Sequence, residues 1–229
     1  GAGLDPCGVL QARIELRANE RSEIVCFLGQ AADHAEARSL IARYRTADLD
    51  AVFRAVAEGW DHVLGTVQVK TPDRSMVVLM NRWLLYQTLA CRVWARSAFY
   101  QAGGAFGFRD QLQDMLALIH VRPDLCRAHL LLAASRQFVE GDVQHWWHPP
   151  SGGGTRTRCS DDLLWLPYVV ASYVSQTGDE SVLDEEVHFL EAAPLEPDQA
   201  EAYQLPHSSS EAASPFAHAV RAISHAMKH

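Results

Sequence analysis

The sequence lacks both a block of basic residues and a long apolar run. Its 229 residues include 28 acidic and 20 basic side chains, which give a net charge of −8. A protein that binds nucleic acid needs clustered positive charge to hold the phosphates, so we expect no nucleic-acid partner. Apolar runs such as 76–80 and 130–134 are far shorter than the roughly 20 residues that cross a bilayer. We therefore predict a globular chain that makes no membrane contact of its own.

Cysteine is also scarce, and no strong metal or phosphate motif is present. The five cysteines are odd in number and widely spaced, which favours reduced thiols packed in the interior of a cytoplasmic protein. His145, His148 and Cys159 are zinc-ligand types, but no second CxxC or HxxxH pair accompanies them, so we predict no metal. The glycines at 152–154 are not followed by Gly-Lys-Ser/Thr and indicate no phosphate-binding loop. We predict no cofactor.

Both ends of the sequence suggest a piece of a longer chain. There is no initiator Met and no signal peptide, and residues 10–16 alternate between apolar and polar as a β-strand does. Residues 24–28 have the pattern of a second strand. Because two strands alone are marginal in water, we predict a hairpin left from a larger sheet. At the other end, a helix from Pro215 carries an apolar stripe that we expect to pack against a further helix.

Helical patterns dominate after residue 30. Asp33 can cap a helix that runs to about Tyr44, and Asp48 can cap another through Trp60. Further helices are predicted over 72–100, 110–120, 123–138, 161–176 and from 215 onward, and the first of these is apolar enough to be buried on most sides. The loop 141–160 is long, and loops of that length are usually functional. Strands are expected only at the start.

Two segments combine glycines, aromatic rings and charged groups. The first, residues 100–114, places Arg109 and Asp110 after three glycines at a helix start. Glycines let the backbone approach a ligand, and an arginine beside a carboxylate offers donors and acceptors to vicinal sugar hydroxyls. The second, residues 145–165, offers tryptophan rings, an adaptable glycine run and two carboxylates at a helix start. The candidate binding residues are Arg109, Asp110, Asp161, Asp162 and Trp165.

These residues also have purely structural interpretations. Arg109 and Asp110 fit a solvated ion pair, with Asp110 as a helix cap, about as well as they fit a binding role. Asp161 and Asp162, together with Ser160, fit capping residues somewhat better than binding residues when nothing else is considered. The residue types alone leave both alternatives open.

Longer strings resemble one family. They are GGAFGFRDQLQD at 103–114, CSDDLLWLPYVV at 159–170 and DEEVHFLE at 184–191 with Pro194-Leu-Glu196, and the opening GAGLDPCG agrees. They resemble glycoside hydrolase family 94, and within it the phosphorylase-like carboxy-terminal region of cyclic β-1,2-glucan synthases and the 1,2-β-oligoglucan phosphorylases. The resemblance covers nearly the whole chain.

The resemblance implies a fold and a division of the chain. It implies a β-sandwich, a helical linker and an (α/α)6 barrel, in that order. Here the end of the sandwich, with its β-hairpin, would cover residues 1–30 and the linker 31–70, and the first half of the barrel would cover 71–229. The expected fold is therefore mainly α, with a partial (α/α)6 barrel.

The resemblance also implies an inverting glycoside phosphorylase. In such enzymes inorganic phosphate, a co-substrate, attacks the anomeric carbon while one aspartic acid protonates the glycosidic oxygen. Arg109 and Asp110 would hold hydroxyls of a β-linked gluco-oligosaccharide at the cleavage site. Asp161, Asp162 and Trp165 would shape the neighbouring wall, and β-1,2-glucan is the favoured substrate.

The expected proton donor is absent from this chain. The family's general acid lies in a Gly-Asp-Trp-Asn-Asp segment, and the sequence has no tryptophan after Trp165. We therefore assign no catalytic residue and expect the chain to be inactive alone. The alternatives are a cellobiose-type or chitobiose-type phosphorylase and a non-catalytic carbohydrate-binding or assembly module. Expected partners are the remainder of the barrel and a second copy in a homodimer.

Overall fold

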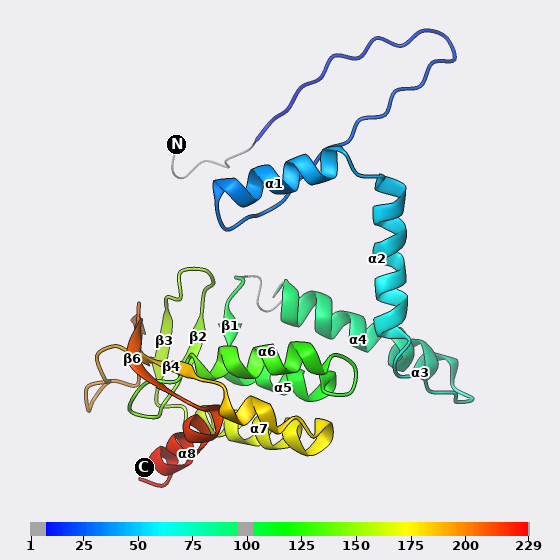
Figure 1. Cartoon of the computed structure of the whole chain (residues 1–229). Coiled ribbons are helices and arrows are strands. Elements are labelled where there is room, and N and C mark those ends of the chain that lie inside the picture. The colour runs from blue at the N-terminus through cyan, green and yellow to red at the C-terminus, as the bar shows by residue number, and fades with distance from the viewer. Residues whose placement is uncertain (1–7, 96–102, 229) are drawn as a thin grey trace. The chain divides into compact units, whose positions relative to one another are not determined.

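The computed structural model describes residues 8–95 and 103–228. The chain divides into two compact units, Gly1–Val56 and Ala57–His229, and each is described by itself. Figure 1 labels the helices and strands used below. Residues 1–7, which include most of the opening string GAGLDPCG and one of the five cysteines, and the predicted end of the helix at Tyr100 lie outside the described residues.

The first unit contains one complete helix, α1 (His34–Arg45). It begins where predicted, because the Asp33 side chain accepts hydrogen bonds from the backbone N–H groups of Ala35 and Glu36. Helix α2 (Leu49–Leu64) starts in this unit and ends in the next. Its predicted cap is also confirmed, since the N–H of Ala51 donates to Asp48 Oδ1 at 3.1 Å.

The hairpin predicted over 10–16 and 24–28 is not formed as strands. Residues 8–32 contain no strand, and their two arms are joined by a turn in which Asn19 has a φ of 66°. The apolar side chains of both arms, such as Leu10 and Leu28, are exposed. Two strands that have neither a third strand nor a core surface to pack against gain too little free energy from pairing to be stable. This explains why the predicted hairpin is not formed.

The second unit opens with a continuous helical region over residues 74–94. It consists of α3 (Arg74–Val78), the π-helical η1 (Leu79–Trp83), α4 (Leu84–Gln87) and the π-helical η2 (Thr88–Trp94). The prediction that this helix is buried on most sides is wrong for the described residues, because Met76 is exposed and Trp83 is 53% exposed. Its packed side faces Trp60 of α2 and, near Leu89, helix α5.

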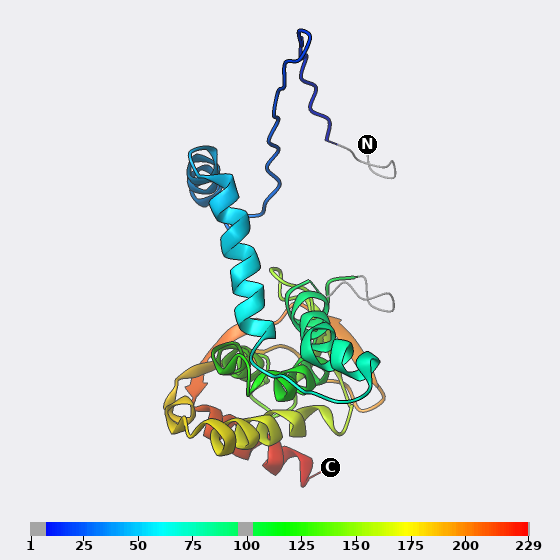
Figure 2. The same cartoon turned by 90° about the vertical axis from the view of Figure 1, so that its right-hand side faces the viewer.

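Four further helices build the core of this unit. They are α5 (Phe108–Leu118), α6 (Pro123–Ala134), α7 (Asp162–Thr177) and α8 (Pro215–Ala226), with a short 3-10 helix η3 (Glu180–Asp184) after α7. Helix α7 packs against α5, α6 and α8 (Figure 2). The contact surfaces are apolar stripes whose fully buried members include Leu112, Met115, Leu130, Leu166 and Ala222. The predicted helix positions are confirmed here.

The expectation that strands occur only at the start is wrong. A four-stranded antiparallel sheet has the order β1 (Phe106–Gly107), β2 (Gln144–Trp147), β3 (Gly154–Thr157) and β5 (Glu201–Gln204). A second, two-stranded antiparallel sheet pairs β4 (Val187–Glu191) with β6 (His207–Ala213).

The segment predicted as a long loop, 141–160, is therefore a hairpin of β2 and β3. Prolines and glycines between these strands conceal the pattern in the sequence, and the strands are only four residues each. Both sheets are antiparallel, and a single isolated parallel bridge joins Phe138 to Leu190 within the described residues. The structure is thus mostly helical with small sheets at the helix ends (Figure 1), and a closed (α/α)6 barrel stays a prediction.

Candidate functional site

The two candidate segments meet through Arg109 and Asp161. These residues are 52 positions apart, yet Arg109 Nη1 donates to Asp161 Oδ2 at 3.0 Å. Trp165, one turn into α7, directs its indole Nε1 toward the same carboxylate oxygen at 3.4 Å. Both charged side chains are about half exposed, so solvent and a solute can reach them.

The start of α5 positions the first pair. Gly107 occupies the N-cap position with an extended backbone, and the helix begins at Phe108. Asp110 is therefore the third residue of the helix and not its cap. A Cβ on Gly107 would lie 2.3 Å from Asp110 Oδ2, so only glycine lets this carboxylate lie against the backbone. The N-cap position thus belongs to Gly107, and the carboxylate of Asp110 lies against it from the first turn.

The start of α7 separates two neighbouring carboxylates. Asp161 occupies the N-cap position, but its side chain makes no capping hydrogen bond. Its Oδ1 accepts instead from the thiol of Cys159 at 3.2 Å, while Oδ2 accepts from Arg109. Asp162, the next residue, has a different partner: it is 2% exposed and is hydrogen-bonded to Nδ1 of His145 on β2.

These contacts change the charge behaviour of the site. The hydrogen bonds from Cys159 and Arg109 hold the pKa of Asp161 below its ordinary value, and the Asp161 partner raises the pKa of Arg109. The hydrogen bond to Asp162 raises the pKa of His145. Burial, with the hydrogen bond to Asp161, raises the pKa of the Cys159 thiol. The site thus holds a guanidinium and a carboxylate at neutral pH, with a protonated thiol beside them.

Residue-type reasoning missed two members of this site. His145 and Cys159 were weighed only as metal ligands, whereas the structure connects each of them to one of the paired aspartates. His148, weighed with them, lies elsewhere and packs edge-on against Trp146 with ring centres 5.2 Å apart. The signal that could have found them is their position, since His145 lies in β2 and Cys159 lies between β3 and the start of α7.

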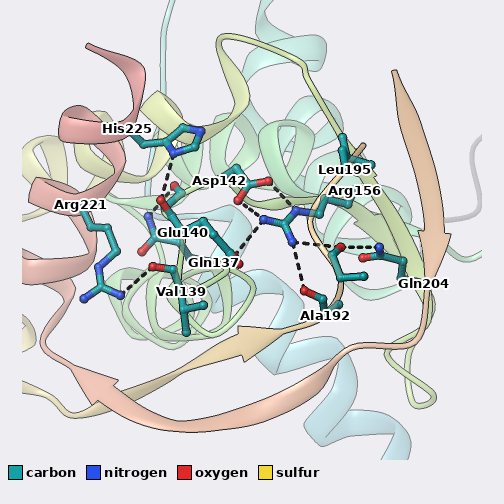
Figure 3. Close-up of polar contacts among 12 residues, drawn as sticks. Gln137, Val139, Glu140, Asp142, Arg156, Ala192, Leu195, Gln204, Arg221 and His225 are labelled. Carbon is teal, nitrogen blue, oxygen red and sulfur yellow. Dashed lines mark hydrogen bonds and ion pairs between the residues drawn. The ribbon is translucent and has the colours of Figure 1, made fainter. Parts of the chain in front are cut away.

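A cavity of about 360 Å³ borders the same segment on the side of Cys159 and Ser160. Arg156 anchors its wall: it is 2% exposed, and its guanidinium forms two 2.6 Å bonds to Asp142 and one 2.9 Å bond to Glu140. Figure 3 shows this cluster between the chain near Ala192 and the side chain of His225, whose Nδ1 lies 2.9 Å from the carbonyl oxygen of Glu140. The wall is therefore rigid and polar.

The arrangement can bind hydroxylated compounds. Arg109 supplies forked donors, Asp161 supplies acceptors, and Trp165 supplies an aromatic face beside them. Charged hydrogen bonds to hydroxyls and an aromatic face are the contacts that orient a sugar ring.

Two family models match the chain. Residues 59–229 match the family model "Glycosyl hydrolase 94 superfamily, catalytic domain", and residues 1–47 match "Glycosyl hydrolase 94, supersandwich domain". The sequence is 44% identical over 219 residues to the cyclic beta-(1,2)-glucan synthase NdvB of Rhizobium meliloti (strain 1021), which covers 96% of this chain and 8% of that protein.

More distant relatives are phosphorylases. The chain is 29% identical over 214 residues to the N,N'-diacetylchitobiose phosphorylase of Vibrio furnissii, covering 81% of this chain and 26% of the relative. It is 26% identical over 193 residues to the cellobionic acid phosphorylase of Neurospora crassa, covering 80% of this chain and 23% of the relative. The chain thus spans about a quarter or less of the length of these relatives. No helix in the described ranges is both long and apolar enough to cross a bilayer.

Proposed function

Because this chain belongs to the glycosyl hydrolase 94 superfamily, we propose that it is the sugar-binding part of an inverting phosphorylase-type catalytic domain. The observation that best supports this proposal is the contact between Arg109 and Asp161. It joins the two motif segments across 52 residues, with Trp165 beside them. Separate helix caps would not need this contact. In this proposal Arg109 and Asp110 hold hydroxyls of the sugar, and Asp161, Asp162 and Trp165 form the adjoining wall.

The proposed substrate is a β-1,2-linked glucan, with inorganic phosphate as co-substrate. The relative whose name includes this linkage is 44% identical over 96% of the chain, whereas the chitobiose relative is 29% identical over 81%. Chemistry of this type needs one carboxylic acid to protonate the leaving oxygen while phosphate attacks from the opposite face. The chain has no tryptophan after Trp165 with which to form the family's acid-bearing segment, so its own residues bind and orient the sugar.

A chitobiose-type or cellobiose-type specificity is the second candidate, favoured by the phosphorylase relatives. The two candidates are separated by titrating the chain with β-1,2-, β-1,3- and β-1,4-linked gluco-oligosaccharides and with N,N'-diacetylchitobiose in a calorimeter. We expect the β-1,2 series to bind most tightly and the chain to release no glucose 1-phosphate from it. Tighter binding of another compound would assign that specificity instead, and phosphorolysis by the chain would contradict the assignment of a binding part only.

The role of Asp110 is tested by Asp110→Asn. If its carboxylate accepts hydrogen bonds from sugar hydroxyls, the amide inserts a donor where an acceptor is needed. Charged hydrogen bonds contribute about 1.5–3 kcal/mol, so affinity for the sugar should fall about 10- to 150-fold while the melting temperature changes little.

The matched control is Asp124→Asn, because Asp124 also lies in the first turn of a helix, α6, and pairs with a neighbouring arginine. This control should bind sugar as the original chain does. Equal affinity of the Asp110 and Asp124 variants would refute the sugar-binding role of Asp110 and leave Arg109 and Asp161 to be tested in the same way.

A further inference from the structure

Three chemically different donor groups meet beside the proposed sugar site. His145 comes from β2, Cys159 from the segment after β3, and Asp162 from the first turn of α7. One ligand atom of each, a ring nitrogen, a thiol sulfur and a carboxylate oxygen, lies within 4.8 Å of the other two. Asp162 is also part of the proposed wall of the sugar site, whereas His145 and Cys159 have no proposed contact with the sugar.

A second observation points to a positively charged ligand here. Asp162 is 2% exposed, and its Oδ1 has no hydrogen-bond partner among the described residues, while Oδ2 is bonded to His145. A buried carboxylate oxygen without a partner is costly, and native proteins usually satisfy such atoms with a donor, a water molecule or an ion. This oxygen belongs to the same carboxylate that completes the triad.

We propose that His145, Cys159 and Asp162 form a binding site for a thiophilic divalent cation, with zinc as the best-matched ion. Imidazole nitrogen, thiolate sulfur and carboxylate oxygen are all zinc ligands, whereas calcium and magnesium take oxygen ligands. The fourth position of a tetrahedral ion remains open to water. The site departs from the prediction of no metal and replaces the His148 considered there with Asp162.

The geometry permits coordination with small adjustments. Zinc binds sulfur at about 2.3 Å and nitrogen or oxygen at about 2.0–2.2 Å, so its ligand atoms lie roughly 3.5 Å apart. Two atoms at the 4.8 Å limit need to approach by about 1 Å, whereas the hydrogen-bonded atoms of His145 and Asp162 need to move apart to admit the ion. His145 is 38% exposed and Cys159 lines the open cavity, so both side chains can turn, and an ion can enter from solvent. The ion replaces the hydrogen bond between His145 and Asp162, and the thiol proton passes to solvent.

The test uses the chain without an affinity tag. Zinc binding is measured by calorimetry, and cobalt(II) is added separately because a cobalt–thiolate bond gives a charge-transfer absorption that histidines alone do not give. We expect one equivalent of zinc to bind and the cobalt–thiolate band to appear. Cys159→Ser should abolish the band and weaken zinc binding at least about tenfold. His145→Gln should also weaken zinc binding while leaving Cys159 available.

Cys91→Ser is the matched control, because Cys91 is another free, partly buried thiol and lies outside the triad. It should keep both the band and the affinity. Melting curves of all variants establish that each is folded. The proposal is overturned if folded original chain binds no zinc, or if the Cys159 and His145 variants bind it as tightly as the Cys91 variant. Sugar binding is not part of this test, so its outcome is independent of the proposed function.

Discussion

Arg156 offers the sharpest test of how the cavity wall is stabilised. Its guanidinium is 2% exposed and is surrounded by the carboxylates of Asp142 and Glu140 and by backbone carbonyls of residues 192 and 193. It also lies 4.0 Å from the ring centre of Phe138. Replacing it with methionine in Arg156→Met retains much of the apolar stem but removes every one of these polar contacts.

The expected loss of stability follows from the Asp142 carboxylate, which remains in place when the guanidinium is removed. Asp142 is only 15% exposed at its side chain, so the variant leaves a carboxylate that is mostly buried and no longer neutralised. Breaking a buried ion pair on one side costs about 3–5 kcal/mol, whereas Glu140, which is 39% exposed, adds little because water screens it. We expect the free energy of unfolding to fall by about 3–5 kcal/mol, measured by urea denaturation at neutral pH with tryptophan fluorescence as the probe.

Two further variants show whether the buried charge is the cause. Arg158→Met, two residues along and bonded only to backbone carbonyls in exposed positions, should cost less than about 1 kcal/mol. Adding Asp142→Leu to Arg156→Met should recover part of the loss, because it removes the unpaired carboxylate. A loss below about 1 kcal/mol in Arg156→Met, or no recovery in the double variant, would refute the electrostatic reasoning.

Two other predictions concern the same unit. Burial lowers the pKa of His218 to about 4 from 6.5, so below pH 6.5 the unfolded chain binds a proton that the folded chain does not, and stability is lost as pH falls toward 4. In urea denaturation, the original chain's free energy of unfolding relative to that of the His218→Gln variant should fall by about 3 kcal/mol between pH 7 and pH 4. A difference between the two chains that does not change with pH would contradict the lowered pKa. Gly154→Ala would place a Cβ 2.0 Å from the Trp146 carbonyl oxygen and should lower the free energy of unfolding by at least about 2 kcal/mol in the same assay. Gly153→Ala meets only side-chain atoms, chiefly the end of the Tyr203 side chain, which can move, so it should cost less. Equal losses in the two variants would contradict this reasoning.

The helices were predictable because their signals are local. Asp33 and Asp48 accept hydrogen bonds from N–H groups at the starts of α1 and α2, as their positions before helical patterns predicted. Such caps and stripes depend on residues within a few positions of one another. The burial of a helix depends instead on distant parts of the chain. For this reason the sequence placed the helix correctly but did not predict the exposed face at Trp83.

The strands could not be predicted because their stability comes from distant partners. Strand β3 gains its place between β2 and β5, and the β5 partner of Thr155 is Tyr203, 48 residues later in the chain. Residues 10–16 show the opposite case, since a clear alternating pattern has no sheet to join among the described residues and stays extended. Alternation therefore indicates that a segment is able to form a strand, and pairing decides whether it does.

The site shows the same division between local and distant causes. The sequence located Arg109, Asp110, Asp161, Asp162 and Trp165 as chemically active positions, and the structure joins three of them, Arg109, Asp161 and Trp165. The role of Asp161 was ambiguous because an aspartate before a helix fits both a cap and a ligand-binding group. Its backbone does take the N-cap position, yet its carboxylate is bonded to Cys159 and Arg109 and makes no capping bond. Its two oxygens accept instead from the Arg109 guanidinium and the Cys159 thiol, and the contact with the distant Arg109 could not be inferred from the residues next to the helix. A capping motif whose side chain is bonded elsewhere leaves the helix start less satisfied than it could be, so a local pattern alone does not distinguish a cap from a residue with a distant partner.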